Sequence, residues 1–145
     1  MTILTRKWTP PQGGKIDFQG TEERPGPERL LDELIKMYNI VEVAYDPYQL
    51  HDLATRFNKR GIAWFRAFNQ GNDRLIADSQ LHDLIRDRRF WHRGDAELRD
   101  HMQNANAETG SEDRKMRIVK RAENLKIDLV VCASMGCHEI LRLNL

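Results

Sequence analysis

The segment from residue 39 to residue 68 constrains the fold of this chain more than any other. Its first part, "NIVEVAYD" (39–46), has the apolar density of an interior strand of a parallel sheet. "DPYQLHDLATRFNKRG" (46–61) follows with its apolar residues on one helical face and a glycine at its end. "IAWFRAF" (62–68) is a second buried strand. Because strand, helix and strand within about thirty residues form a right-handed crossover, the sequence predicts two parallel strands in an α/β fold.

An edge strand, a long loop and a helix are expected ahead of this crossover. "TILTRKW" (2–8) alternates weakly and is rich in strand-forming residues with long charged neighbours, which predicts a strand at a sheet edge. Residues 9–27 hold four of the five prolines and four of the nine glycines, so we expect a long loop there. Pro27 suits the first turn of a helix that runs to about Tyr38.

The C-terminal half is expected to contain three helices and one half-exposed strand after a turn at 69–71. Basic and apolar residues alternate over 114–121, which predicts that strand. Apolar residues at helical spacing and polar turns set the other boundaries. The full order is a helix through Leu75 and Ile85, a short extended piece near 89–93, a helix over 95–108, a polar turn at 109–113, the strand, and a helix over 126–145.

Length and composition point to one ordinary globular domain. The chain has 145 residues, so we expect a single domain over residues 1–145. Hydrophobic residues make up 40% and charged residues 31%. No apolar run is long enough to cross a bilayer and no leader follows Met1, so we expect a cytoplasmic protein without membrane contact. The formal charge of +1 does not mark a dedicated nucleic-acid binder, so local clusters must carry any such role.

Two aspartates occupy positions typical of catalytic or metal-binding acids. Asp46 follows the strand at 39–46, and ligands gather beyond the carboxyl ends of parallel strands. The alternative is an Asp-Pro turn whose carboxylate caps the next helix. Asp128 lies in the first turn of the last helix, where the helix dipole alone also favours an acid. If the two side chains converge, their repulsion requires a divalent cation such as Mg²⁺ or Mn²⁺.

Two basic clusters are candidates for contacts with DNA phosphates. The first lies on the strand and turn that lead to Asp128 and consists of Arg117, Lys120, Arg121 and Lys126. The second surrounds Trp91 and His92 and consists of Arg86, Arg88, Arg89 and Arg93. For both clusters the alternative is a solvated charged face.

The predicted helix over 95–108 offers one further set of polar side chains. His101 and Asn104 share a helical face with Glu97. This arrangement leaves a role in proton transfer or metal binding open. The alternative is an ordinary surface helix.

Five segments of the chain occur together in one known family. In order they are "VEVAYDPYQLHDLATRF", "GIAWFRAFNQG", "RLIADSQLHDLI", "LRDHMQNANA" and "RIVKRAENLKIDLVVCASM". In this order they resemble the nuclease domain of phage terminase large subunits. The resemblance implies an RNase H-like mixed sheet flanked by helices, which cuts concatemeric double-stranded viral DNA during genome packaging. It also implies that Asp46 and Asp128 belong to the acids that hold Mg²⁺ or Mn²⁺.

The chain departs from the family pattern at its start. The complete family domain resembles a chain with two further strands upstream, the first of them central in the sheet and carrying another metal-binding Asp. This chain begins at Met1 with what looks like the third strand. The resemblance therefore implies an incomplete, N-terminally truncated domain in which the two-ion site is partly retained. With two of the metal acids, we expect weak binding of the divalent ions and slow or absent cleavage.

The resemblance also defines the expected partners and leaves two alternatives. It implies double-stranded DNA and, in full-length members, the ATPase domain, the small terminase subunit and the portal, in the cytoplasm of a bacterial host. No G-x-x-x-x-G-K-[ST] motif occurs, so this chain cannot drive translocation alone. One alternative is an inactive prophage remnant that binds DNA or a packaging partner through its basic face without cleaving. Another is a relative of Holliday-junction resolvases, which share the fold.

Overall fold

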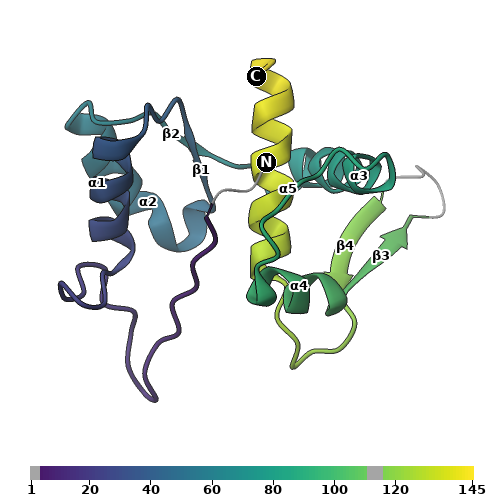
Figure 1. Ribbon diagram of the computed structural model, residues 1–145, viewed down its shortest axis with the longest axis horizontal. Coiled ribbons are helices and arrows are strands. Elements are labelled where there is room, and N and C mark those ends of the chain that lie inside the picture. Colours follow the sequence, from purple (N-terminus) through teal and green to yellow (C-terminus); the bar gives the residue numbers. More distant parts are fainter. Residues whose placement is uncertain (1–3, 111–115) are drawn as a thin grey trace. The chain divides into compact units, whose positions relative to one another are not determined.

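The computed structural model of the protein describes residues 4–110 and 116–145, which divide into two compact units (Figure 1). The N-terminal unit is Arg6–Ala67. The C-terminal unit is Phe68–Leu145 together with Leu4 and Thr5. The expectation that residues 1–145 form a single domain stays a prediction.

The N-terminal unit contains the strand-helix-strand crossover that the sequence predicts. Its elements are α1 (Pro27–Met37), β1 (Val43–Tyr45), α2 (Pro47–Lys59) and β2 (Phe65–Ala67). The strands β1 and β2 pair in parallel, with Val43 opposite Phe65. This pairing confirms the crossover, although both strands are shorter than the apolar runs that predicted them.

A small aromatic core holds the N-terminal unit together. Phe57 of α2 is fully buried, and its ring lies 5.3 Å from that of Phe65 in β2. Leu31 and Ile35 of α1 pack against the same core. Arg56 of α2 adds two hydrogen bonds, of 2.8 and 3.0 Å, to the Glu28 carboxylate of α1. The parallel pair is thus covered by two helices that are also joined by a bidentate ion pair.

Local signals fix the ends of α2. Asp46 is the N-cap and Pro47 occupies the first helical turn. Gly61 follows the helix with a φ of +63°, a conformation that glycine adopts without steric cost. Beyond that turn, the Asn58 side chain bonds to the backbone N–H and C=O of Phe65, at 2.8 and 3.1 Å. The helix end is therefore tied directly to β2.

The prediction of an edge strand at 2–8 is wrong over the part of this range that the structure describes, residues 4–8. Residues 4–10 have no regular secondary structure, and residues 2 and 3 lie outside the described part. The Trp8 indole N–H instead donates a hydrogen bond of 3.0 Å to the Pro25 carbonyl oxygen. Contact with the long loop therefore replaces strand pairing. The predicted loop over 9–27 is confirmed up to Gly26, with one isolated bridge between Gly20 and Pro25.

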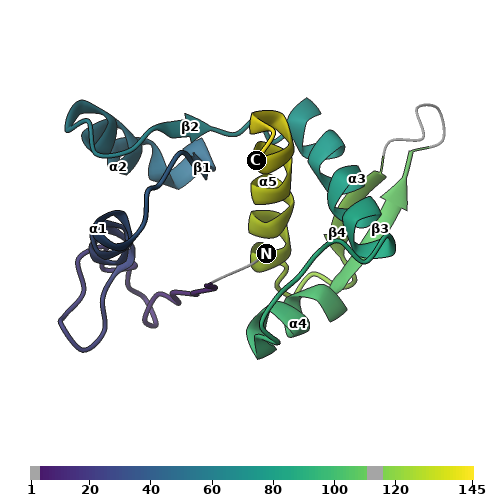
Figure 2. The same cartoon turned by 45° about the horizontal axis from the view of Figure 1, so that its top comes forward.

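The described residues of the C-terminal unit form three helices and an antiparallel strand pair. The elements are α3 (Asn72–Arg86), α4 (Ala96–Gln103), β3 (Ala105–Thr109), β4 (Met116–Lys120) and α5 (Asp128–Leu143). The helix α3 packs against both α5 and β4, and α4 packs against α5 (Figure 2). Fully buried side chains from α3 and α4, Leu81 and Leu98, lie in the core of this unit.

One helix boundary in this unit differs from the expectation. The helix predicted over 95–108 ends at Gln103, and residues 105–109 form β3. Ala105 pairs with Lys120 and Thr109 with Met116. Antiparallel pairing with the next strand, β4, has overridden the local helical pattern. Of the polar turn expected at 109–113, residues 111–113 lie outside the described part.

The strand pairs bear on the expected fold class. The described residues contain one parallel and one antiparallel pair in two separate two-stranded sheets, flanked by helices. This arrangement confirms a mixed α/β class. The RNase H-like sheet lacking its first two strands stays a prediction. Among the described residues no helix has the length and apolar character needed to span a bilayer.

Candidate nucleic-acid interface

An open groove of about 570 Å³ lies in the C-terminal unit along β4, the turn after it and the start of α5. Ile118, Val119, Ile127 and Val131 form its apolar part. The charged residues that line it are Arg74, Arg117, Lys120, Arg121, Glu123 and Asp128. Four basic and two acidic residues therefore line the groove, and of the basic residues Arg74 is paired with Asp78. The remaining excess of basic residues makes the groove attractive to a polyanion.

Three of the four basic residues predicted to contact DNA line this groove. Arg117 and Lys120 are exposed on β4, and neither makes an ion pair with any described residue. Arg121 donates a hydrogen bond of 2.9 Å from Nε to the Ala105 carbonyl oxygen, so it also closes the base of the β3–β4 hairpin. Lys126 is exposed but is not among the residues that line the groove.

Asp128 lies at the groove in the first turn of α5, as predicted, and is exposed. Two hydrogen bonds hold the start of α5, and with it Asp128, in position. The backbone N–H of Leu129 donates to His101 Nδ1 over 3.0 Å, and His101 is buried. Asn104 donates from Nδ2 to the Lys126 carbonyl oxygen over 3.1 Å. Both side chains, for which proton-transfer or metal roles were open, thus anchor the segment that carries Asp128.

The hydrogen bond that His101 accepts indicates which of its ring nitrogens carries the proton. An imidazole nitrogen that accepts a backbone N–H carries no proton, so the proton of neutral His101 is on Nε2. The ring therefore acts as a cap for an otherwise uncapped helix, because Ile127 at the N-cap position has no side-chain oxygen. The sequence did not reveal this contact, since the two residues are 28 positions apart.

Asp46 lies in the N-terminal unit, directly after β1 as predicted. Its Oδ1 accepts the backbone N–H of Tyr48 over 3.0 Å, which is the capping role expected as the alternative. Asp46 is exposed, and Asp128 belongs to the other unit. The metal site expected to be shared by the two aspartates therefore stays a prediction. Among the described residues, no group of three or more His, Cys, Asp or Glu side chains is arranged to hold a metal ion.

A buried ion pair lies beneath the groove. It was not predicted from the sequence. Arg74 Nε donates to Asp78 Oδ1 over 2.8 Å, and the residues are 6% and 0% exposed. Asp78 also accepts from Ser134 Oγ at 2.6 Å and from the Ile118 N–H at 2.9 Å. The network joins α3, β4 and α5. Its signal in the sequence is the four-residue spacing of Arg74 and Asp78 on the same helical face as Leu81.

The family assignment rests on the length of chain that matches. The family model described as "Terminase large subunit, endonuclease domain" matches residues 12–141. The chain belongs to this family. No curated protein and no solved structure gives a significant match. Membership in the terminase endonuclease family supports a nuclease role in phage DNA packaging, with DNA and the packaging complex as partners in general terms.

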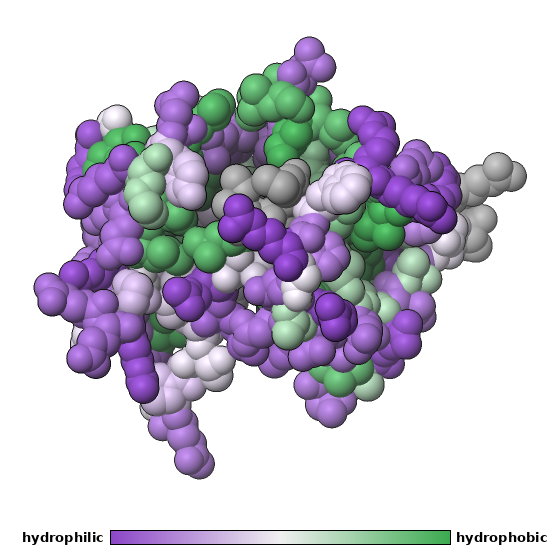
Figure 3. Space-filling model, viewed as in Figure 1, coloured by the Kyte–Doolittle hydropathy of each residue, from purple (hydrophilic) through white to green (hydrophobic). Residues whose placement is uncertain are grey.

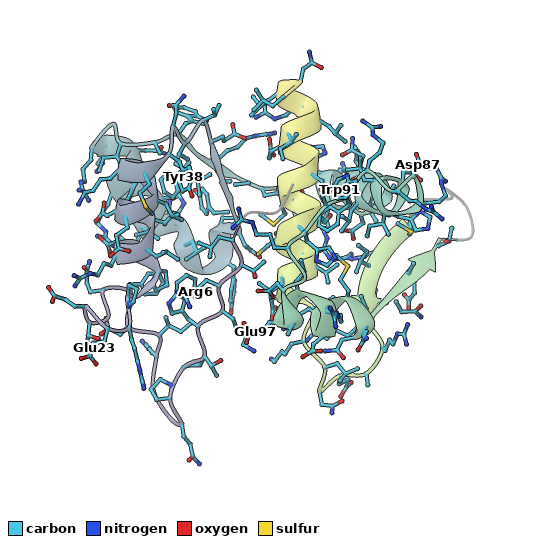
Figure 4. All side chains as sticks on the ribbon, viewed as in Figure 1. Arg6, Glu23, Tyr38, Asp87, Trp91 and Glu97 are labelled. Carbon is cyan, nitrogen blue, oxygen red and sulfur yellow. The ribbon has the colours of Figure 1, made fainter. Side chains whose placement is uncertain are left out.

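The second basic cluster of this terminase endonuclease domain lies away from the groove lining. Arg86 pairs with Asp83 at 3.1 Å and with Asp87 at 3.0 Å, so its charge is largely neutralised. Trp91, in the segment that joins α3 to α4, is 67% exposed and is labelled in Figure 4. Most of the surface visible in Figure 3 is hydrophilic, with apolar residues in separate patches. The ion pairs of Arg86 favour the solvated face for this residue, and DNA contact by the rest of the cluster stays a prediction.

Proposed function

We propose that this chain is a metal-dependent endonuclease domain of a phage terminase large subunit, which hydrolyses phosphodiester bonds of double-stranded concatemeric DNA. The groove carries the proposal, because it places Asp128 beside Arg117, Lys120 and Arg121. The family match supports the same activity. Genome packaging takes place in the bacterial cytoplasm, so we place the activity there. The ATPase domain, the small terminase subunit and the portal are the partners that this role requires.

The basic residues of the groove are suited to hold a DNA backbone. Arg117 and Lys120 both lie on β4 without ion pairs to described residues, so their charges are available to phosphates. Arg121 follows them directly, with its guanidinium oriented by the Ala105 carbonyl oxygen. Because such contacts release counterions from DNA, binding should weaken steeply as the salt concentration rises.

The carboxylates fit a hard divalent cation by their chemistry. Asp128 presents exposed carboxylate oxygens in the groove, and oxygen ligands suit Mg²⁺ or Mn²⁺. Asp46 uses Oδ1 as a cap, and we propose that its carboxylate also contributes to the ion. When bound, such an ion supplies an activated water and neutralises charge on the phosphate. Two carboxylates are few for the two ions of the complete family site, so we expect weak metal binding.

A nicking assay tests the proposal. Wild-type protein should convert supercoiled plasmid to nicked circles in Mn²⁺ or Mg²⁺, and EDTA should stop the reaction. Asp128→Asn should abolish nicking, because the amide keeps the size of the side chain but loses its charge. Asp100→Asn is the matched control, since Asp100 is exposed on α4 outside the groove. Equal nicking by the Asp128 variant would contradict the assigned site.

The non-catalytic remnant is the second candidate. The capping contact of Asp46 favours it, because Oδ1 already accepts the Tyr48 N–H in a structural role. In that case the basic groove would still bind DNA or a packaging partner, but wild-type protein would show salt-sensitive DNA binding without nicking at any divalent ion concentration. The same assay, with binding measured in parallel, separates the two candidates.

A further inference from the structure

Arg74 combines deep burial with access to the groove. The residue is only 6% exposed, yet it is one of the four cations that line the groove. A buried guanidinium is costly unless it is paired, and here the partner is Asp78 at 2.8 Å. The pair is therefore a preformed feature of the groove floor and not a mobile surface charge.

The Asp78 carboxylate is fixed from three directions. Its Oδ1 accepts from Arg74 Nε and from Ser134 Oγ of α5. Its Oδ2 accepts the backbone N–H of Ile118 in β4. Because Asp78 cannot rotate without breaking these bonds, it holds the plane of the Arg74 guanidinium in one orientation.

The terminal nitrogens of Arg74 are much less well satisfied than its Nε. Nη1 contacts Gln70 Oε1 and Nη2 contacts the Ile118 carbonyl oxygen, both at 3.4 Å. These distances are long for N–H···O bonds. Each terminal nitrogen also carries a second N–H that these contacts leave unused. An ionised oxygen in the groove would accept shorter, charge-assisted bonds from the same nitrogens.

We propose that Arg74 forms a phosphate-binding subsite in the groove, and that its ligand is a phosphodiester of the DNA backbone. The inference rests on the proposed function, because that function brings DNA into the groove. Asp78 is the positioning residue that aims the guanidinium. Arg117 and Lys120 on the adjacent strand would hold neighbouring phosphates. The place of Arg74 in the groove lining and the two long contacts of its terminal nitrogens together support a ligand for this guanidinium.

The first test measures DNA affinity by fluorescence anisotropy with a short duplex in EDTA. The double variant R74M/D78N removes both charges together, because loss of Arg74 alone would leave Asp78 buried and uncompensated. The amide that replaces the Asp78 carboxylate can still accept the Ile118 N–H and donate to Ser134 Oγ. We expect affinity to fall about tenfold or more. The slope of log affinity against log salt should fall by ~0.9, the value of one phosphate contact.

Arg99→Met is the matched control for this test. Arg99 is exposed on α4 in the same unit and does not line the groove. Its replacement should leave affinity and salt slope unchanged. A folded R74M/D78N protein with the affinity and slope of wild type would overturn the inference.

A second measurement uses the wild-type chain and does not depend on the folding of a variant. The Arg74 Nε–H signal should be observable by NMR, because its bond to a buried carboxylate slows exchange with water. It should shift when the same duplex is added. A signal that moves with inorganic phosphate but not with DNA would overturn the DNA assignment in favour of a site for free phosphate. A signal that moves with neither would overturn the subsite.

The outcomes also separate this inference from the proposed function. If wild-type protein never nicks DNA but the Arg74 signal responds to duplex, the cutting role fails and the phosphate contact stands. If nicking depends on Asp128 but the Arg74 Nε–H signal does not change when duplex is added, only the proposed contact between Arg74 and a phosphate fails. If wild-type protein does not bind duplex DNA at all, both fail.

Discussion

At the residue scale, two side chains have structural roles that their sequence positions only partly indicate. Asp46 caps α2 through the Tyr48 N–H, and His101 caps α5 through the Leu129 N–H. Either residue can therefore affect nuclease activity through the fold as well as through chemistry. Substitutions that change one role and keep the other are needed to separate these effects.

Asp46→Ala should lower the free energy of unfolding by about 1 kcal/mol, because the α2 cap is lost. Asp46→Asn should leave stability nearly unchanged, since asparagine caps as well as aspartate. If Asp46 is also a metal ligand, both variants should lose nicking. Urea unfolding together with the plasmid assay checks this prediction. An Asp46→Asn variant with full nicking activity would leave Asp46 only its capping role.

His101→Leu should lower the free energy of unfolding by about 1–3 kcal/mol, because it leaves the Leu129 N–H buried without an acceptor. His82→Leu is the control, since His82 is exposed on α3. Urea unfolding monitored by circular dichroism measures both. Equal stability of the two variants would contradict the capping role assigned to His101.

At the element scale, the C-terminal unit depends on how α3, β4 and α5 are joined. Asp78 is the common partner of all three through Arg74, Ile118 and Ser134. Residues of β4 and of the start of α5 line the groove, and the same carboxylate joins these two elements. The network should therefore affect both stability and the proposed DNA binding.

Asp78→Ala should lower the free energy of unfolding by about 3–5 kcal/mol, because it leaves the buried Arg74 charge unpaired. Asp83→Ala on the same helix should change it by less than about 1 kcal/mol, since the Asp83 side chain is about half exposed and pairs with an exposed arginine. Thermal and urea unfolding measure the difference. A small effect at Asp78 would mean that the network is not the main link between these elements.

The sequence predicted the elements whose signals are local. The apolar runs and caps of residues 39–68 specify strand, helix and strand directly, and the structure confirms that crossover. Arg117, Lys120, Arg121 and Asp128, which line the groove, lie within one short stretch of the sequence, whereas Arg74 lies far from it and was not singled out. By contrast, β3 forms through pairing with β4 and was mistaken for helix. The caps and ion pairs that tie distant segments, such as His101 to Leu129, leave no local pattern.

At the scale of the whole molecule, the family match covers both units, but the acids assigned to the metal site are divided between them. Asp46 follows β1 of the N-terminal unit, and Asp128 begins α5 of the C-terminal unit. The proposed cutting mechanism assigns both aspartates to the same ion. The proposed binding of DNA along the groove does not require Asp46, so binding and cleavage can be tested separately.

The most direct test of a shared ion is a titration of the isotope-labelled protein with Mn²⁺, which broadens NMR signals close to the bound ion. We predict that the amide signals of Asp46 and Asp128 broaden together at the same substoichiometric Mn²⁺ concentration. Asp128→Asn should remove both effects, and Asp100→Asn should remove neither. Broadening at only one of the two aspartates, or at neither, would contradict the shared site and with it the proposed cutting mechanism.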